Sequence, residues 1–65
     1  MAGYSPTRAA ATYHLGLVMF KSGEQRDGLT NIRLALDMSE RVGGLGEKDV
    51  QEARRLLESS KPIEP

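Results

Sequence analysis

Apolar side chains on both sides of one predicted helix constrain this fold more than any other sequence feature. The helix is predicted from about Pro6, where Ser5 can cap free backbone N–H groups, to about Lys21, where Ser22-Gly23 ends it. One stripe along it comprises Ala11, Leu15, Val18 and Met19, and a second on roughly the opposite side comprises Tyr13, Leu17 and Phe20, with Ala9 and Ala10 nearby. A helix that is apolar on both sides requires two neighbours.

Gly16 lies inside this predicted helix, although a glycine there costs about 1 kcal/mol relative to alanine. We interpret Gly16 as the place where a neighbouring helix comes too close for a side chain. A leucine at this position is therefore expected to disrupt the packing between helices.

Two further helices are predicted, so the chain is predicted to be all-α with three helices in total. The first runs from about Gln25 to Val42, with Leu29, Ile32, Leu36 and Ala35 on one side and Leu34 and Met38 on the other. The second runs from about Glu47 to Ser59, with Val50, Ala53, Leu56 and Leu57 on one stripe. No stretch alternates as a strand would.

The connections between these segments predict the domain organisation. Only a few residues join the first two helices, so residues 6–42 are expected to form an antiparallel helical hairpin. Residues 43–46 form a glycine-rich turn before the third helix at 47–59, and we expect a flexible N-terminus at 1–5 and an irregular tail at 60–65.

Length and composition limit the classes of function. A chain of 65 residues buries only roughly 60% of the surface that its unfolded form exposes, so its stability is marginal. Because it has no cysteine, neither a disulfide nor a thiolate zinc site can add stability. Oligomerisation or attachment to a larger protein is therefore expected. Nine basic residues balance nine acidic ones, which argues against a nucleic-acid or membrane partner. The sequence shows no signal peptide and no transmembrane segment, and a cytoplasmic location is favoured.

The hairpin resembles a tetratricopeptide repeat, a helix–turn–helix unit of about 34 residues with the pattern W-x2-L-G-x2-Y, A-x3-F and P. Leu15-Gly16 matches the Leu-Gly pair, Met19 stands at the Tyr, and Gly28-x3-Ile32 stands at the A-x3-F. Ala35 matches the small residue of the second helix, and "KSGEQRDGL" resembles the family's turn. The sequence departs from the pattern at two places: Thr12 replaces the opening aromatic residue, and Glu40 replaces the proline. The resemblance covers one repeat, about residues 8–42, and residues 47–59 resemble a capping helix or the first helix of a truncated next repeat.

The resemblance implies a non-catalytic interaction module or scaffold that binds a partner peptide or helix, or another copy of itself through stacked or exchanged helices. The candidate partner-binding residues are Tyr13, Leu17, Phe20, Lys21, Leu34 and Met38. The first three fall where the family lines its concave groove, Lys21 extends that face, and the last two would stack on a neighbouring repeat. The favoured alternative for Tyr13, Leu17 and Phe20 is a core position under the third helix or another copy.

Other chemistry finds little support in the sequence. Tyr13 and Leu17 occupy the places where some family members clamp a C-terminal carboxylate, so we reject that subtype. His14 has no second metal ligand, and the glycines at 43–46 lack the Lys-Ser/Thr of a phosphate loop. No nucleophile or base stands beside the carboxylates, so we predict a non-enzyme with no cofactor and no metal.

A small helical adaptor that binds nucleic acid is the alternative function. It would use scattered arginines, namely Arg8, Arg26, Arg33, Arg41, Arg54 and Arg55. The zero net charge and the interspersed acidic residues favour no nucleic acid as partner.

Overall fold

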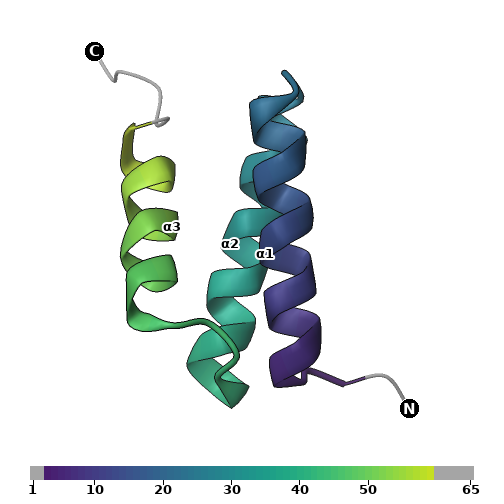
Figure 1. Cartoon of the computed structure of the whole chain (residues 1–65), viewed down its shortest axis with the longest axis vertical. Helices are drawn as coiled ribbons and strands as arrows, with labels where there is room; N and C mark the ends of the chain where they lie inside the picture. The colour runs from purple at the N-terminus through teal and green to yellow at the C-terminus, as the bar shows by residue number, and fades with distance from the viewer. Residues whose placement is uncertain (1–2, 60–65) are drawn as a thin grey trace.

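The computed structural model describes residues 3–59, which form three α-helices (Figure 1). These are α1 (Pro6–Lys21), α2 (Gln25–Val42) and α3 (Glu47–Ser59). The prediction of an all-α fold with three helices is confirmed, and the helices occupy the predicted ranges. The predicted tail at 60–65 and the first two residues of the predicted N-terminus lie outside the described residues.

Local signals fix both ends of α1. Ser5 has an extended backbone, and its Oγ accepts a hydrogen bond of 3.1 Å from the Arg8 N–H. At the other end Gly23 takes the left-handed conformation, with φ of 106°. Its N–H donates to the Phe20 carbonyl at 3.3 Å, and the next N–H, of Glu24, donates to the Met19 carbonyl at 2.9 Å. This pair of bonds is a Schellman motif, which ends the helix and turns the chain back.

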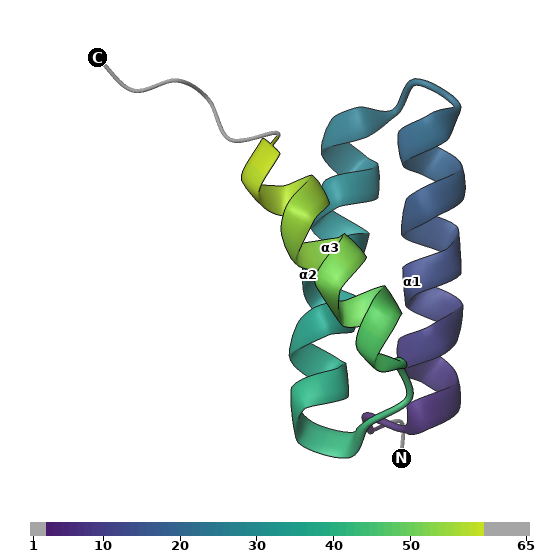
Figure 2. The ribbon, with the colours of Figure 1, turned by 60° about the vertical axis from the view of Figure 1, so that its left-hand side comes forward.

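The turn places α1 and α2 side by side and antiparallel (Figures 1 and 2). The two backbones approach each other closely at Gly16 and Gly28. A Cβ at Gly16 would lie 2.8 Å from the Gly28 carbonyl oxygen and 2.8 Å from Ile32 Cγ1. A Cβ at Gly28 would lie 2.7 Å from the Gly16 carbonyl oxygen. The prediction that a helix comes too close at Gly16 for a side chain is confirmed.

The third helix packs against α2 rather than extending the hairpin, as Figure 2 shows. Two glycines with positive φ, Gly43 (83°) and Gly44 (108°), turn the chain after α2. A Cβ on Gly44 would collide with the Pro6 backbone at the start of α1. The glycine-rich turn thus lies directly on the hairpin, and this close contact directs the chain into α3.

The core lies where the three helices meet. Its fully or almost fully buried members are Tyr13 from α1, Ile32 and Ala35 from α2, and Ala53 from α3. Partly buried side chains pack around them, namely Leu17, Leu29, Leu36, Leu45, Leu56 and Leu57. Ala9 and Met38 are also buried. Tyr13 and Ile32 are the largest side chains that the described residues bury completely, so the core is small for a chain of 65 residues.

Candidate functional site

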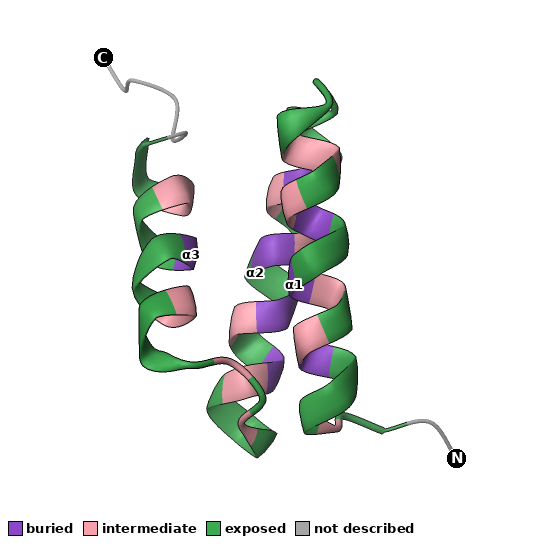
Figure 3. Ribbon diagram, viewed as in Figure 1, coloured by how far each residue is buried: buried purple, intermediate pink, exposed green. Residues whose placement is uncertain are grey.

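The side of α1 that faces away from α2 is apolar and exposed to solvent. We call this surface, formed by Ala11, Leu15 and Val18, the outer face of α1. Leu15 is 53% exposed and Val18 is 64% exposed, and Figure 3 shows exposed residues along α1 between its buried ones. Residues four and three apart share one side of a helix, so these side chains form a continuous stripe.

The outer face of α1 is exposed because the opposite side of the helix packs against α2. Ala9, Tyr13 and Gly16 are the buried residues of α1, and they recur at helical spacing on one side. That spacing directs Leu15 and Val18 away from α2. A surface helix ordinarily carries charged residues on its solvent side, but α1 has no Asp, Glu, Lys or Arg between Arg8 and Lys21, and its one titratable side chain near the outer face is the exposed His14.

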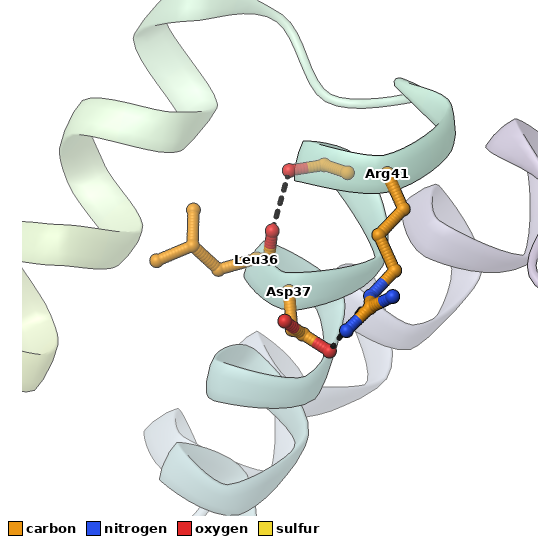
Figure 4. Close-up of polar contacts among 4 residues, drawn as sticks. Leu36, Asp37 and Arg41 are labelled. Carbon is orange, nitrogen blue, oxygen red and sulfur yellow. Dashed lines mark hydrogen bonds and ion pairs between the residues drawn. The ribbon is translucent and has the colours of Figure 1, made fainter.

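The outer side of α2 has the charged character that the outer face of α1 lacks. Arg41 and Asp37 form an ion pair at 3.6 Å on the surface of α2, while the neighbouring Leu36 extends towards α3 (Figure 4). The Ser39 hydroxyl donates to the Leu36 carbonyl at 2.8 Å, which ties the hydroxyl to its own helix (Figure 4). This part of the outer side of α2 is therefore charged and exposed to solvent.

The outer side of α3 is likewise polar. Arg54 on α3 pairs with Glu40 on α2 at 3.7 Å, and both side chains are more than half exposed. Gln51, Arg55 and Glu58 of α3 are also exposed to solvent. Among the described helices, α1 alone turns an uncharged face to water.

On the side of α1 opposite the outer face, a hydrogen bond from Tyr13 links α1 to α3. Its phenol is almost wholly buried and donates a hydrogen bond of 2.9 Å to Glu52 Oε1. Burial raises the pKa of Tyr13 well above its ordinary value of about 10, and the hydrogen bond to Glu52 and the negative charges of Glu52 and Asp49 add to the effect. The neutral phenol holds α3 over the hairpin.

The structure separates the residues predicted to line a groove. Tyr13 is buried in the core beside Ala53 of α3, and Leu17 packs against the same cluster. For these two the alternative of a core under the third helix holds, because their side of α1 also carries the close contact at Gly16. Phe20 is half-buried, and Lys21 is exposed at the end of α1. Tyr13 is therefore not accessible to a partner while the three helices are packed.

The two candidates on α2 do not share a surface. Met38 is 2% exposed and belongs to the interior, whereas Leu34 is 43% exposed. Leu34 borders an open hollow of about 430 Å³ whose lining residues, Thr30, Arg33, Leu34 and Asp37, all come from α2. The wall of this hollow is mostly apolar surface, although an arginine and an aspartate also line it, and all four lining residues come from one helix.

Sequence reasoning recognised the stripe with Leu15 and Val18 but placed three of the candidate binding residues, Tyr13, Leu17 and Phe20, on the opposite side of the helix, which packs against the rest of the fold. The position of Gly16 contained the missing signal. Tyr13 and Phe20 lie three residues before and four residues after Gly16, on the side that the neighbouring helix must approach, and Leu15 and Val18 do not.

Groups that could support other chemistry are sparse within residues 3–59. His14 is exposed on α1, and its ring lies 6.2 Å from that of Tyr13, centroid to centroid. The described residues contain no group of three or more histidine, cysteine, aspartate or glutamate side chains placed to hold a metal ion. None of the three helices is both long enough and apolar enough to cross a membrane.

Comparisons of the chain with models of protein families, with curated proteins and with solved structures give no significant match.

Proposed function

We propose that this chain is a non-catalytic protein-interaction module of the tetratricopeptide type, which binds an apolar protein surface through the outer face of α1. The observation that carries the proposal is the uncharged, exposed stripe of Ala11, Leu15 and Val18 on a helix whose other side is already packed. A contiguous exposed apolar patch is the kind of surface that protein-interaction sites use, which supports the proposal.

Three features support the resemblance on which the repeat type rests. The hairpin crosses at Gly16 and Gly28, which are positions of the repeat pattern. The third helix covers one side of α2 with a polar outer surface, as a capping helix does. The outer face of α1 is then the uncapped side of the unit, where a stacked helix would bury Leu15 and Val18.

A nucleic-acid interface gains no support from the arrangement of the arginines. They are distributed over all three helices, and Arg41 and Arg54 are paired with Asp37 and Glu40. Phosphate binding requires cations gathered on one face with few carboxylates among them. The apolar outer face of α1 would contribute nothing to such binding.

Photo-crosslinking tests the proposal. A benzoylphenylalanine at Val18 places the reactive group on the outer face of α1, and the same group at the exposed Gln51 of α3 is the matched control. Both variants are expressed in the cells that produce the chain, irradiated, and their adducts identified by mass spectrometry. We expect protein adducts from position 18 and few from position 51. Equal yields at the two positions, or none at position 18, would contradict the proposal.

A further inference from the structure

We propose that α3 is a lid, which undocks from the hairpin of α1 and α2 as a unit while the two hairpin helices stay packed. Opening uncovers the core side of α1, where Tyr13 and Leu17 lie. The lid acts on the side of α1 opposite the outer face, so the inference goes beyond the proposed function and does not depend on it. Its support is the difference between how α1 and α3 are held to α2.

The contact between α1 and α2 is close and buries residues along both helices. A Cβ on Gly16 would lie 2.8 Å from the Gly28 carbonyl oxygen, so the two backbones almost touch at this crossing. Packing of this density is lost only when the hairpin itself unfolds. The buried residues are Ala9, Tyr13 and Gly16 on α1, and Gly28, Ile32, Ala35 and Met38 on α2.

The contact that holds α3 is much smaller. Among the described helices, its backbone comes near α2 and not near α1. Ala53 is its one buried residue, and the larger side chains of Leu56 and Leu57 are only partly buried. Elements with few buried apolar side chains open at a lower free energy than the core does. The lid can therefore open without the hairpin.

Two polar contacts join α3 to the hairpin, and water can replace both. Arg54 and Glu40 lie 3.7 Å apart with both side chains more than half exposed, and an exposed ion pair contributes little to stability. The Tyr13 hydroxyl donates to Glu52 at 2.9 Å, and Glu52 is an exposed residue. On opening, the phenol and the carboxylate are both hydrated, so neither polar group is left without a partner.

The chain before α3 is fixed at one residue and unconfined two residues later. Gly44 lies against the backbone of Pro6, where a Cβ would collide, and Leu45 packs against the core. A Cβ on Gly46 would meet no atom within 4 Å. Gly46 directly precedes α3, which is joined to the hairpin at this end (Figure 2). We therefore place the hinge at Gly46, with residues 43–45 remaining docked.

Undocked α3 also loses its helical structure. A helix of 13 residues is marginal in water, so its backbone hydrogen bonds break once the contact with α2 is lost. Amide hydrogen exchange in the middle of α3 therefore reports undocking.

Native-state hydrogen exchange of the wild-type chain, followed by NMR spectroscopy at urea concentrations below the unfolding transition, tests the proposal. The amides of Ala53 and Leu56 should be protected at least about tenfold less than those of Ile32 and Ala35. Their opening should also depend less steeply on urea, because undocking exposes less surface than unfolding. An equal urea dependence in all three helices would overturn the proposal, since α3 would then open only with the whole chain. A dependence near zero in α3 would also overturn it, since no surface would be uncovered.

The variant Gly28→Ala separates opening of the lid from unfolding of the hairpin. The added Cβ would press on the backbone of α1, so it destabilises the hairpin and leaves the contacts of α3 in place. Exchange at Ile32 and Ala35 should become about five to thirty times faster, while exchange at Ala53 should change less than about twofold. An equal acceleration at Ala53 would overturn the proposal. No acceleration in any helix would remove the tight crossing on which the proposal rests.

Thiol labelling tests whether the inner side of α3 becomes accessible. Ala53→Cys and Ala9→Cys each place the chain's only thiol at a completely buried alanine, the first on α3 and the second in the hairpin. Labelling of position 53 should be at least about ten times faster than labelling of position 9. Equal rates would overturn the proposal. Far-UV circular dichroism shows whether each variant folds, and if Ala53→Cys does not, exchange in the wild-type chain decides the question.

Discussion

The close contact between α1 and α2 at Gly28 predicts an effect of Gly28→Ala that opposes ordinary helix propensity. Alanine is better than glycine in a helix by about 1 kcal/mol, so propensity alone predicts stabilisation. In this structure the added Cβ would lie 2.6 Å from the Phe20 nitrogen, 2.7 Å from the Gly16 carbonyl oxygen and 2.9 Å from the Phe20 Cα. All three are backbone atoms of α1, so no side chain can rotate to make room.

The loss of stability depends on how far α1 and α2 must move apart to make room for the added Cβ. Ordinary van der Waals contact begins at 3.4 Å, so α1 must retreat by somewhat less than about 1 Å along the whole crossing. Overpacking of a well-packed interface costs about 1–3 kcal/mol, and the upper part of that range applies because only the backbone can yield. After the gain in propensity, Gly28→Ala should lower the free energy of unfolding by about 1–2 kcal/mol. For a chain of this size the melting temperature then falls by about 4–16 °C.

Thermal and urea unfolding followed by far-UV circular dichroism measures this change. Gly3→Ala is the control, because a Cβ there meets no atom within 4 Å and the residue lies outside the helices, and its effect should stay within about 0.5 kcal/mol. All chains are compared at one protein concentration, since association also adds to apparent stability. A Gly28→Ala chain that is as stable as wild type, or more stable, would refute the close crossing of α1 and α2.

Two further substitutions test other parts of the fold. Tyr13→Phe removes the hydrogen bond to Glu52 and should cost about 1 kcal/mol in urea unfolding at neutral pH. Because the pKa of Tyr13 is raised in the fold, wild type should also lose up to about 1.4 kcal/mol per pH unit above about pH 10, where the unfolded phenol ionises first. The same titration of Tyr13→Phe should lack this loss, and an equal loss would assign it to other groups. Ser5→Ala removes the acceptor of the Arg8 N–H and should cost about 1 kcal/mol in thermal unfolding, whereas an unchanged melting temperature would mean that the cap contributes nothing.

The helices were predictable from the sequence because their limits depend on local signals. Ser5-Pro6 and Ser22-Gly23 act within one turn of the chain, and the structure shows the cap and the Schellman motif that they form. Gly16 was equally informative, since a glycine in a helix interior needs a steric reason. The close contact with Gly28 supplies that reason.

The side of α1 that stays exposed was harder to predict because both of its sides are apolar. Periodicity distinguishes an apolar side from a polar one, and it gives no basis for choosing between two apolar stripes. The tertiary contact at Gly16 decides the choice: it buries Tyr13 and leaves Leu15 and Val18 in solvent. The resemblance to a repeat groove therefore placed the candidate site on the side that the fold uses for its core.

The position of α3 depends on contacts between distant parts of the chain. Gly44 rests on the backbone of Pro6, 38 residues earlier, and the hydrogen bond between Tyr13 and Glu52 spans 39 residues. Neither contact leaves a periodic pattern in the sequence. The third helix was predictable as an element, but its burial of Tyr13 was one of two open alternatives.

The most direct test of the central claim is NMR spectroscopy of the isotope-labelled chain in an extract of the cells that produce it, compared with the isolated chain. Chemical shifts and line widths report which residues change environment when a protein partner binds. If the outer face of α1 is the contact surface, the largest changes will map to Ala11, Leu15 and Val18, while Leu34 on α2 stays constant. A spectrum in the extract identical to that of the isolated chain, or changes centred on α2 or α3, would contradict the account.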